Sequence, residues 1–122
     1  MTDSPDKILV VDDEPSIRAL YQMAFAHSGY DVQVASTGED AWECLTEEPV
    51  KLVFLDLNLP GIKGLELCRN IKKSWPECRL VAISGNIKQY GKEACMDAGF
   101  SAVLPKPIQL ADLLNAARTA LT

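Results

Sequence analysis

Five short apolar runs divide the chain, and each is followed by a longer stretch in which apolar residues recur every three or four positions. The runs cover residues 8–11, 31–35, 52–55, 80–83 and 102–104. Short runs rich in Val, Leu and Ile are typical of strands that are covered on both faces, as in a parallel sheet. The spacing between them predicts amphipathic helices, so that strand and helix alternate along the chain.

Local signals place the ends of these helices. The first helix is expected to begin at Pro15, where the missing N–H costs nothing, and to end before Gly29. Its inward face is predicted to carry Ile17, Leu20, Tyr21, Ala24 and Phe25. The other helices are predicted after a cap at Ser36 or Thr37, around Leu65 to Trp75, from about Ile87 to Ala98, and from Leu110 to Leu121.

Five strand–helix units with short connections predict an α/β fold. Right-handed crossovers favour a flavodoxin-like (βα)5 arrangement, a doubly wound parallel five-stranded sheet in the order 2-1-3-4-5. No repeat, low-complexity segment or linker interrupts the pattern. We therefore expect one domain over residues 1–122, in which residues 1–6 form a short N-terminal tail.

Composition narrows the function classes. The chain has 122 residues and a net charge of −5, which disfavours direct binding to nucleic acid or to an anionic membrane. It contains neither an apolar run long enough to span a membrane nor a secretory signal at its start, so we expect a cytoplasmic protein. Four cysteines without a CxxC pair, and a single histidine, indicate reduced thiols rather than a zinc site.

Charged residues follow three of the predicted strands. Asp12 and Asp13 come after the first strand, Asp56 ends the third, and Lys106 follows the fifth. The carboxyl ends of parallel strands form one rim, where ligands bind beside the switch point between strands one and three. Three carboxylates repel one another unless a cation lies among them, and oxygen ligands suit Mg²⁺. A lysine beside such a cluster suits a transferred phosphoryl group.

Each of these residues also has a simpler interpretation when it is taken alone. Asp12 and Asp13 could be acids that favour a helix N-terminus, and Lys106 could be a solvated loop residue. Ser84, at the end of the fourth strand, could donate to an anion or merely cap the next helix. The convergence of these residues on one rim favours a joint function.

The motifs DDEP (residues 12–15), DLNLPG (residues 56–61) with Gly64, Ser84-Gly85 and Lys106-Pro107 resemble the receiver domain of bacterial two-component response regulators. The resemblance covers essentially the whole chain. It implies that Asp56 accepts a phosphoryl group from a sensor histidine kinase or phosphotransfer protein and thereby switches the binding of an output partner. The domain would be no enzyme beyond catalysing this transfer and the later hydrolysis.

The resemblance also assigns the ligands. Asp13, Asp56 and the main-chain carbonyl of Asn58 would hold Mg²⁺, and Asp12 would help through a water molecule. Ser84 and Lys106 would contact the phosphoryl oxygens. The peptide bond between Lys106 and Pro107 is expected to be cis.

One departure from the family pattern concerns signalling. The family usually has an aromatic residue where this chain has Val103, so the coupled rotamer switch with Ser84 is expected to be altered or missing. Tyr90 could supply an aromatic surface instead, or it could be a plain exposed residue. Asn58 and Asn86 occupy the positions that tune the lifetime of the phosphoryl group in the family.

Three other functions remain as alternatives. A phosphohydrolase with an aspartyl nucleophile would commonly need an acid where this chain has Asn58. A flavodoxin-like FMN carrier would need a hydroxyl- and glycine-rich loop in place of DDEP. A degenerate receiver that binds partners without phosphorylation would not need the complete set of acids, serine and lysine.

Overall fold

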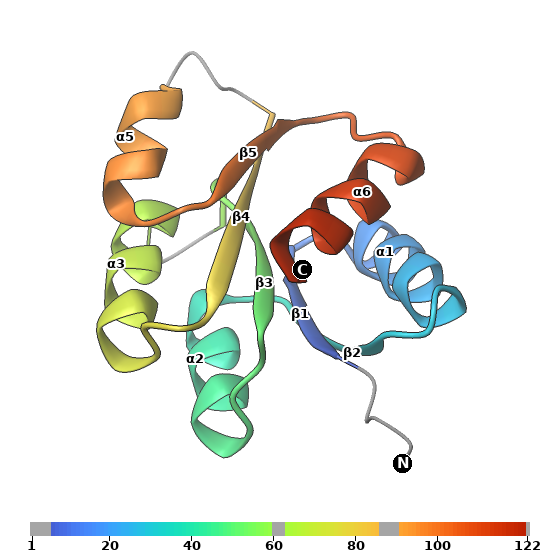
Figure 1. The fold of residues 1–122 in the computed structure, drawn as a ribbon, viewed down its shortest axis with the longest axis horizontal. Coiled ribbons are helices and arrows are strands. Elements are labelled where there is room, and N and C mark those ends of the chain that lie inside the picture. The colour runs from blue at the N-terminus through green and yellow to red at the C-terminus, as the bar shows by residue number, and fades with distance from the viewer. Residues whose placement is uncertain (1–5, 60–62, 86–90, 122) are drawn as a thin grey trace.

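The computed structural model describes residues 6–59, 63–85 and 91–121, and the account below is confined to them. Five parallel strands form one sheet in the order β2-β1-β3-β4-β5, which confirms the predicted topology (Figure 1). The strands are β1 (Lys7–Val11), β2 (Asp31–Ala35), β3 (Leu52–Asp56), β4 (Arg79–Ser84) and β5 (Ala102–Pro105). Asp56 and Ser84 are thus the last residues of their strands.

Helices cover both faces of the sheet. They are α1 (Pro15–His27), α2 (Gly38–Glu47), α3 (Gly64–Ser74), α5 (Lys92–Ala98) and α6 (Leu110–Leu121). Figure 1 shows α1 and α6 on one face and α2, α3 and α5 on the other. The architecture is therefore the doubly wound α/β fold that the alternating pattern predicts.

The sheet separates two apolar clusters. One holds residues of α2, α3 and α5, such as Leu45, Leu67 and Cys95, against alternate strand residues. The other holds Tyr21 and Phe25 of α1 and residues of α6. Because successive side chains of a strand point to opposite faces, the central strands must be apolar at nearly every position. This explains why β3 is buried throughout, Asp56 included.

The helix ends follow the local signals. Pro15 occupies the first turn of α1, and Gly29 after that helix has φ of 93°. Of the two caps considered for α2, the structure selects Thr37, whose Oγ1 accepts the N–H of Asp40 at 3.0 Å. Gly99 ends α5 in the left-handed region, with φ of 118°.

Two predictions about the helices are wrong. A continuous helix from about Ile87 is excluded because Gly91 has φ of 72°, and α5 begins at Lys92; residues 86–90 lie outside the described part. Leu20 was expected inside but is 41% exposed, because it lies at the edge of the apolar stripe of α1. In α3 the spacing missed Leu67, which is buried while Leu65 is half-buried.

The cysteines and tryptophans have structural explanations. All four thiols are free, and Cys68, Cys78 and Cys95 are buried, as expected for packed reduced cysteines. Trp42 of α2 packs edge-on against Trp75, with ring centroids 5.0 Å apart. None of the described helices is both long and apolar enough to cross a membrane.

Candidate functional site

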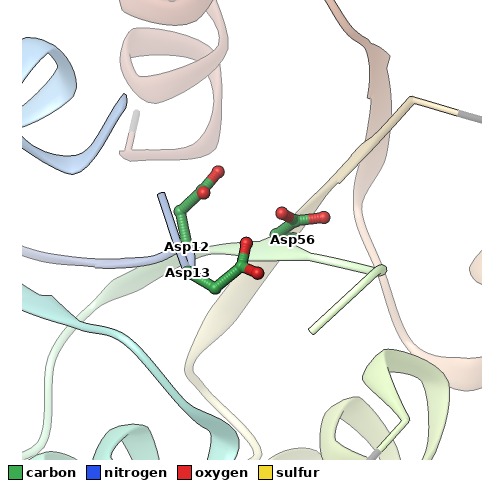
Figure 2. Close-up of side chains that lie close together, drawn as sticks. All are labelled: Asp12, Asp13 and Asp56. Carbon is green, nitrogen blue, oxygen red and sulfur yellow. The ribbon is translucent and has the colours of Figure 1, made fainter. Parts of the chain in front are cut away.

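Three acids meet at the carboxyl ends of the two central strands. Val11 pairs with Leu55, so Asp12 and Asp56, the next residue in each case, lie side by side. One carboxylate oxygen from each of Asp12, Asp13 and Asp56 lies within 4.8 Å of the other two (Figure 2). Asp12 and Asp56 are 0% and 2% exposed, whereas Asp13 is exposed. The rim therefore carries two buried carboxylates and one that faces solvent.

Main-chain groups hold the two buried carboxylates. The N–H of Glu14 donates to Oδ1 of Asp12 at 2.9 Å, and the N–H of Asn58 donates to Oδ1 of Asp56 at 2.9 Å. Each acid thus accepts from the residue two positions later, a local turn that Asp readily forms. The loops after β1 and β3 therefore hold the carboxylates of Asp12 and Asp56 in place through their main-chain N–H groups.

Lys106 joins the same two acids. Its Nζ donates to Oδ2 of Asp12 at 3.1 Å and to Oδ2 of Asp56 at 3.0 Å. Each buried carboxylate therefore uses one oxygen for a main-chain N–H and the other for this ammonium. One lysine serves two carboxylates, and the net charge of the three side chains is negative when all are ionised.

The pKa values reflect this imbalance. Burial raises the pKa of Asp12, the charge of Asp56 adds to the increase, and the hydrogen bonds from Glu14 and Lys106 only partly counter it. Burial alone would lower the pKa of Lys106, but the hydrogen bonds and charges of Asp56 and Asp12 raise it to about 12. The site therefore keeps its lysine protonated, and a further cation would favour the ionised form of Asp12.

Ser84 and Lys106 lie on neighbouring strand ends. Ser84 is 1% exposed, and its main-chain oxygen accepts the N–H of Lys106 at 2.8 Å. The peptide bond between Lys106 and Pro107 is cis, which confirms that expectation. Lys106, directly after β5, therefore lies at the same rim as the acids and the serine.

The remaining predicted residues fall into two groups. Asn58 is exposed in the loop after β3, and Val103 is half-buried on β5 and packs against the cluster beneath α5. Gly61, Asn86 and Tyr90 lie outside the described residues. The described structure brings together Asp12, Asp13, Asp56 and Lys106, with Ser84 on the adjacent strand end.

Sequence reasoning missed two residues of α1 near this site. Nη1 of Arg18 donates to the main-chain oxygen of Asp12 at 2.8 Å. Tyr21 is buried, and the loss of solvent around its hydroxyl raises its pKa; the charge of Lys106 partly counters this increase, and the charges of Asp12 and Asp56 add to it. Helical side chains lean toward the helix N-terminus, which could have indicated that Arg18 reaches back to Asp12.

The donor chemistry fits a hard cation. The cluster offers carboxylate oxygens, with Asn58 two residues after Asp56, and contains neither thiolate nor imidazole. Mg²⁺ prefers such oxygen ligands and usually keeps some water, which an exposed Asp13 allows. Lys106, 3.0 Å from the Asp56 carboxylate, also places positive charge where an anionic group beside Asp56 would need it.

Comparison with known proteins gives a consistent result. The family model described as the response regulator receiver domain matches residues 8–118. Response regulator MprA of Mycolicibacterium vanbaalenii is 31% identical over 117 residues, which cover 96% of this chain and 51% of that protein. The transcriptional regulatory protein AruR of Pseudomonas aeruginosa is 35% identical, with 92% of this chain and 48% of that protein covered.

A solved structure agrees over the same region. The receiver domain of NtrX from Brucella abortus superposes with a TM-score of 0.86 and 35% identity, covering 93% of this chain and 97% of that one. The chain spans about half the length of the curated relatives it matches. The similarity therefore concerns the domain and not the remainder of those proteins.

Proposed function

Because this chain belongs to the response regulator receiver domain family of two-component systems, we propose that it is controlled by Mg²⁺-dependent phosphorylation of Asp56. The observation that carries the proposal is the convergence of Asp12, Asp13 and Asp56 within 4.8 Å, with Lys106 bonded to Asp56. The phosphoryl group would come from a phosphohistidine of a sensor kinase or phosphotransfer protein. The phosphorylated form would then bind an output partner differently.

Asp13, Asp56 and the main-chain carbonyl of Asn58 would hold the metal, and Asp12 would act through a water molecule. Support comes from the burial of Asp12 and Asp56 beside a single lysine, which leaves negative charge at the rim. When bound, Mg²⁺ would supply positive charge that offsets the negative charge of the carboxylates and of the phosphoryl group.

The residues of this chain would carry out the phosphoryl transfer as follows. A carboxylate oxygen of Asp56 attacks phosphorus, an O–P bond forms, the N–P bond breaks, and its electron pair returns to the histidine of the donor. Lys106, which donates to Oδ2 of Asp56, would then donate to a phosphoryl oxygen. The Ser84 hydroxyl would contact another oxygen. Attack by water on phosphorus later releases inorganic phosphate and restores Asp56, so the domain catalyses only reactions at its own aspartate.

The remaining assignments rest on the family and on charge. We take residues 1–122 as a single receiver domain, with residues 1–6 ahead of the first strand. The chain would act in the cytoplasm. Its direct partners would be proteins, because a net charge of −5 opposes direct binding to nucleic acid or anionic membranes. The face formed by α5, β5 and α6 is the proposed output surface, because it adjoins Ser84 and Lys106.

Phosphorylation with a small acyl phosphate and Mg²⁺, followed by intact mass measurement, tests the proposal. One phosphoryl group should be added, and neither EDTA-treated protein nor Asp56→Asn should be labelled. Asp31→Asn is a matched control, because Asp31 is also an acid but is exposed. It is the first residue of β2 and therefore lies at the end of the sheet opposite the rim. Labelling of Asp56→Asn at the wild-type rate would refute the assignment. Absence of labelling in the wild type would favour a receiver that acts without phosphorylation.

A further inference from the structure

We propose that Arg18 is a positioning residue for the metal site, which orients Asp13 through the peptide that joins it to Asp12. This inference rests on the proposed function, because it assumes that the acids bind Mg²⁺. Arg18 belongs to the first turns of α1, and its side chain leans back over the loop from which the helix begins.

The contact is with the main chain. Nη1 of Arg18 donates to the carbonyl oxygen of Asp12 at 2.8 Å, and the bond is partly buried. This carbonyl belongs to the planar peptide unit between Asp12 and Asp13, so its direction also sets the direction of the Asp13 α-carbon. Figure 2 shows the Asp13 side chain extending from the end of β1 into the cluster with Asp56. A bond to this carbonyl therefore limits where the Asp13 carboxylate can lie.

Asp13 needs such support more than the other two acids do. Asp12 accepts from the N–H of Glu14 and from Lys106, and Asp56 accepts from the N–H of Asn58 and from Lys106. Within the described part of the chain, the carboxylate of Asp13 accepts no hydrogen bond, and the residue is exposed. Its position is thus determined by its main chain, which Arg18 holds from one side.

Arg18 is itself kept in place. The main-chain N–H of Arg18 donates to the main-chain oxygen of Glu14 at 3.0 Å in the first turn of α1. Its half-buried side chain lines a hollow that it shares with Ser36 and with the acids Asp40 and Glu43 of α2. The guanidinium is always charged and presents several donors in a rigid fork, so it can donate to the carbonyl while the nearby acids favour its positive charge.

The two effects of Arg18 on metal binding have opposite signs, which makes the inference testable. The positive charge of Arg18 near the acids repels Mg²⁺, so removal of this charge should by itself tighten Mg²⁺ binding. Loss of the hold on the Asp12–Asp13 peptide should weaken Mg²⁺ binding, because residues that orient ligands contribute to affinity. Weaker binding after removal of Arg18 would therefore identify positioning and not charge.

The experiment is a Mg²⁺ titration of the whole chain by calorimetry, with wild type, Arg18→Ala and Arg118→Ala. Arg118 is a matched control, because it is an exposed arginine in the last turn of α6. We expect the Kd for Mg²⁺ to rise about tenfold in Arg18→Ala and to stay within about twofold in the control. Labelling by acyl phosphate should need more Mg²⁺ for half-saturation in Arg18→Ala and should approach the wild-type rate at saturation. An unchanged or lower Kd would overturn the inference.

Arg18→Lys covers the case in which the alanine variant does not fold. It keeps the charge but lacks the fork, so its Kd should still rise, and a wild-type Kd in a folded Arg18→Lys protein would also overturn the inference. The outcome is separable from that of the proposed function. If the wild type binds Mg²⁺ but is not phosphorylated, the proposed function fails while the Arg18 comparison still decides. If the wild type does not bind Mg²⁺, both fail.

Discussion

Gly64 lies against Leu57 so closely that a β-carbon added to it would be 2.7 Å from Cδ2 and 3.0 Å from the α-carbon of Leu57. The first residue of α3 is therefore packed onto the residue that follows Asp56. Only glycine leaves room for this approach, which explains its place in the motif after Asp56 better than freedom at a turn does. The contact links the start of α3 to the loop that positions Asp56.

Gly64→Ala should accordingly destabilise the protein by about 1–3 kcal/mol, because overpacking beside a main-chain atom forces the loop to shift. Urea unfolding at neutral pH measures the change. Gly85→Ala is the matched control, since among the described residues a β-carbon there would meet only Asn58 Nδ2, at 4.0 Å. A loss of stability in Gly64→Ala no greater than in the control would contradict the packing argument.

Lys106→Met should destabilise the protein near neutral pH, because it leaves two buried carboxylates without their shared cation. Removing one partner of a fully buried ion pair costs roughly 3–5 kcal/mol. The Lys106 side chain is 22% exposed, so the lower end of that range or less is expected. Mg²⁺ should restore more stability to this variant than it adds to the wild type. Lys73→Met, at an exposed residue of α3, is the control, and equal stability of the two variants would count against the role of Lys106.

Mg²⁺ itself should stabilise the fold. At a concentration of about 100 times Kd, binding to the folded state alone adds about 2.7 kcal/mol to the free energy of unfolding. Asp13→Ala should remove most of this gain while leaving the metal-free protein as stable or more so, because a repelling charge is lost. Thermal melts with millimolar Mg²⁺ or EDTA provide the measurement. If the melting temperature of the wild type is the same with Mg²⁺ and with EDTA, the metal site is refuted.

Stability should decline as pH rises above about 9, for a reason unrelated to the acid rim. Burial raises the pKa of Cys68 from 9.0 to about 12 and that of Cys78 to about 11. Both thiols stay protonated in the folded chain while they ionise in the unfolded chain. Their contribution is therefore complete below pH 9 and is lost as pH rises through the folded values.

Below about pH 10 the slope reflects mainly the thiols, because Lys106 has an unfolded pKa of 10.5 and loses its own contribution only between that value and about 12. Burial also raises the pKa values of Cys44 and Cys95, so these two thiols add to the slope. Cys68→Ala should make the plot of unfolding free energy against pH less steep, whatever the variant's overall stability. Cys44→Ala, at a half-buried thiol, should change the slope less. An unaltered slope in Cys68→Ala would contradict the assignment.

Phosphorylation should act mainly on the segment between β4 and α5. Val103 has no ring to swing between two rotamers, and a β-branched side chain is stiff at χ1. Amide NMR shifts on addition of beryllium fluoride should therefore concentrate in residues 84 to 92, which include Tyr90. Val103→Ala should leave this pattern in place. Shifts confined to Asp56 and its immediate contacts would refute the prediction.

The sequence was sufficient for the topology because burial on both faces leaves a simple signature. Runs such as residues 52–55 are apolar throughout, and a charged residue directly after one can lie only at the rim. The strand order then placed Asp12 beside Asp56 without knowledge of any contact. The site was predictable to the level of which residues meet.

Details that depend on side-chain length and on one main-chain angle were not predictable. Gly91 has a positive φ that ends any helix before α5, and a glycine in a sequence carries no sign of its φ. Leu20 follows helical spacing yet faces outward, because the apolar stripe of α1 is narrower than the pattern suggested. The sharing of Lys106 between Asp12 and Asp56 depends on distances that only the folded rim supplies.

The strands that carry the site residues differ in how deeply they are buried. Asp12 and Asp56 extend from β1 and β3, which are central and almost wholly buried, whereas Lys106 extends from β5, an edge strand of half-exposed residues. Asp56 thus lies in the most buried part of the sheet, and its counter-charge comes from an edge strand. A group added to Asp56 would therefore be accommodated on the side of Lys106. We expect the resulting movement to spread outward, toward β5 and the helices beside it, and not into the core.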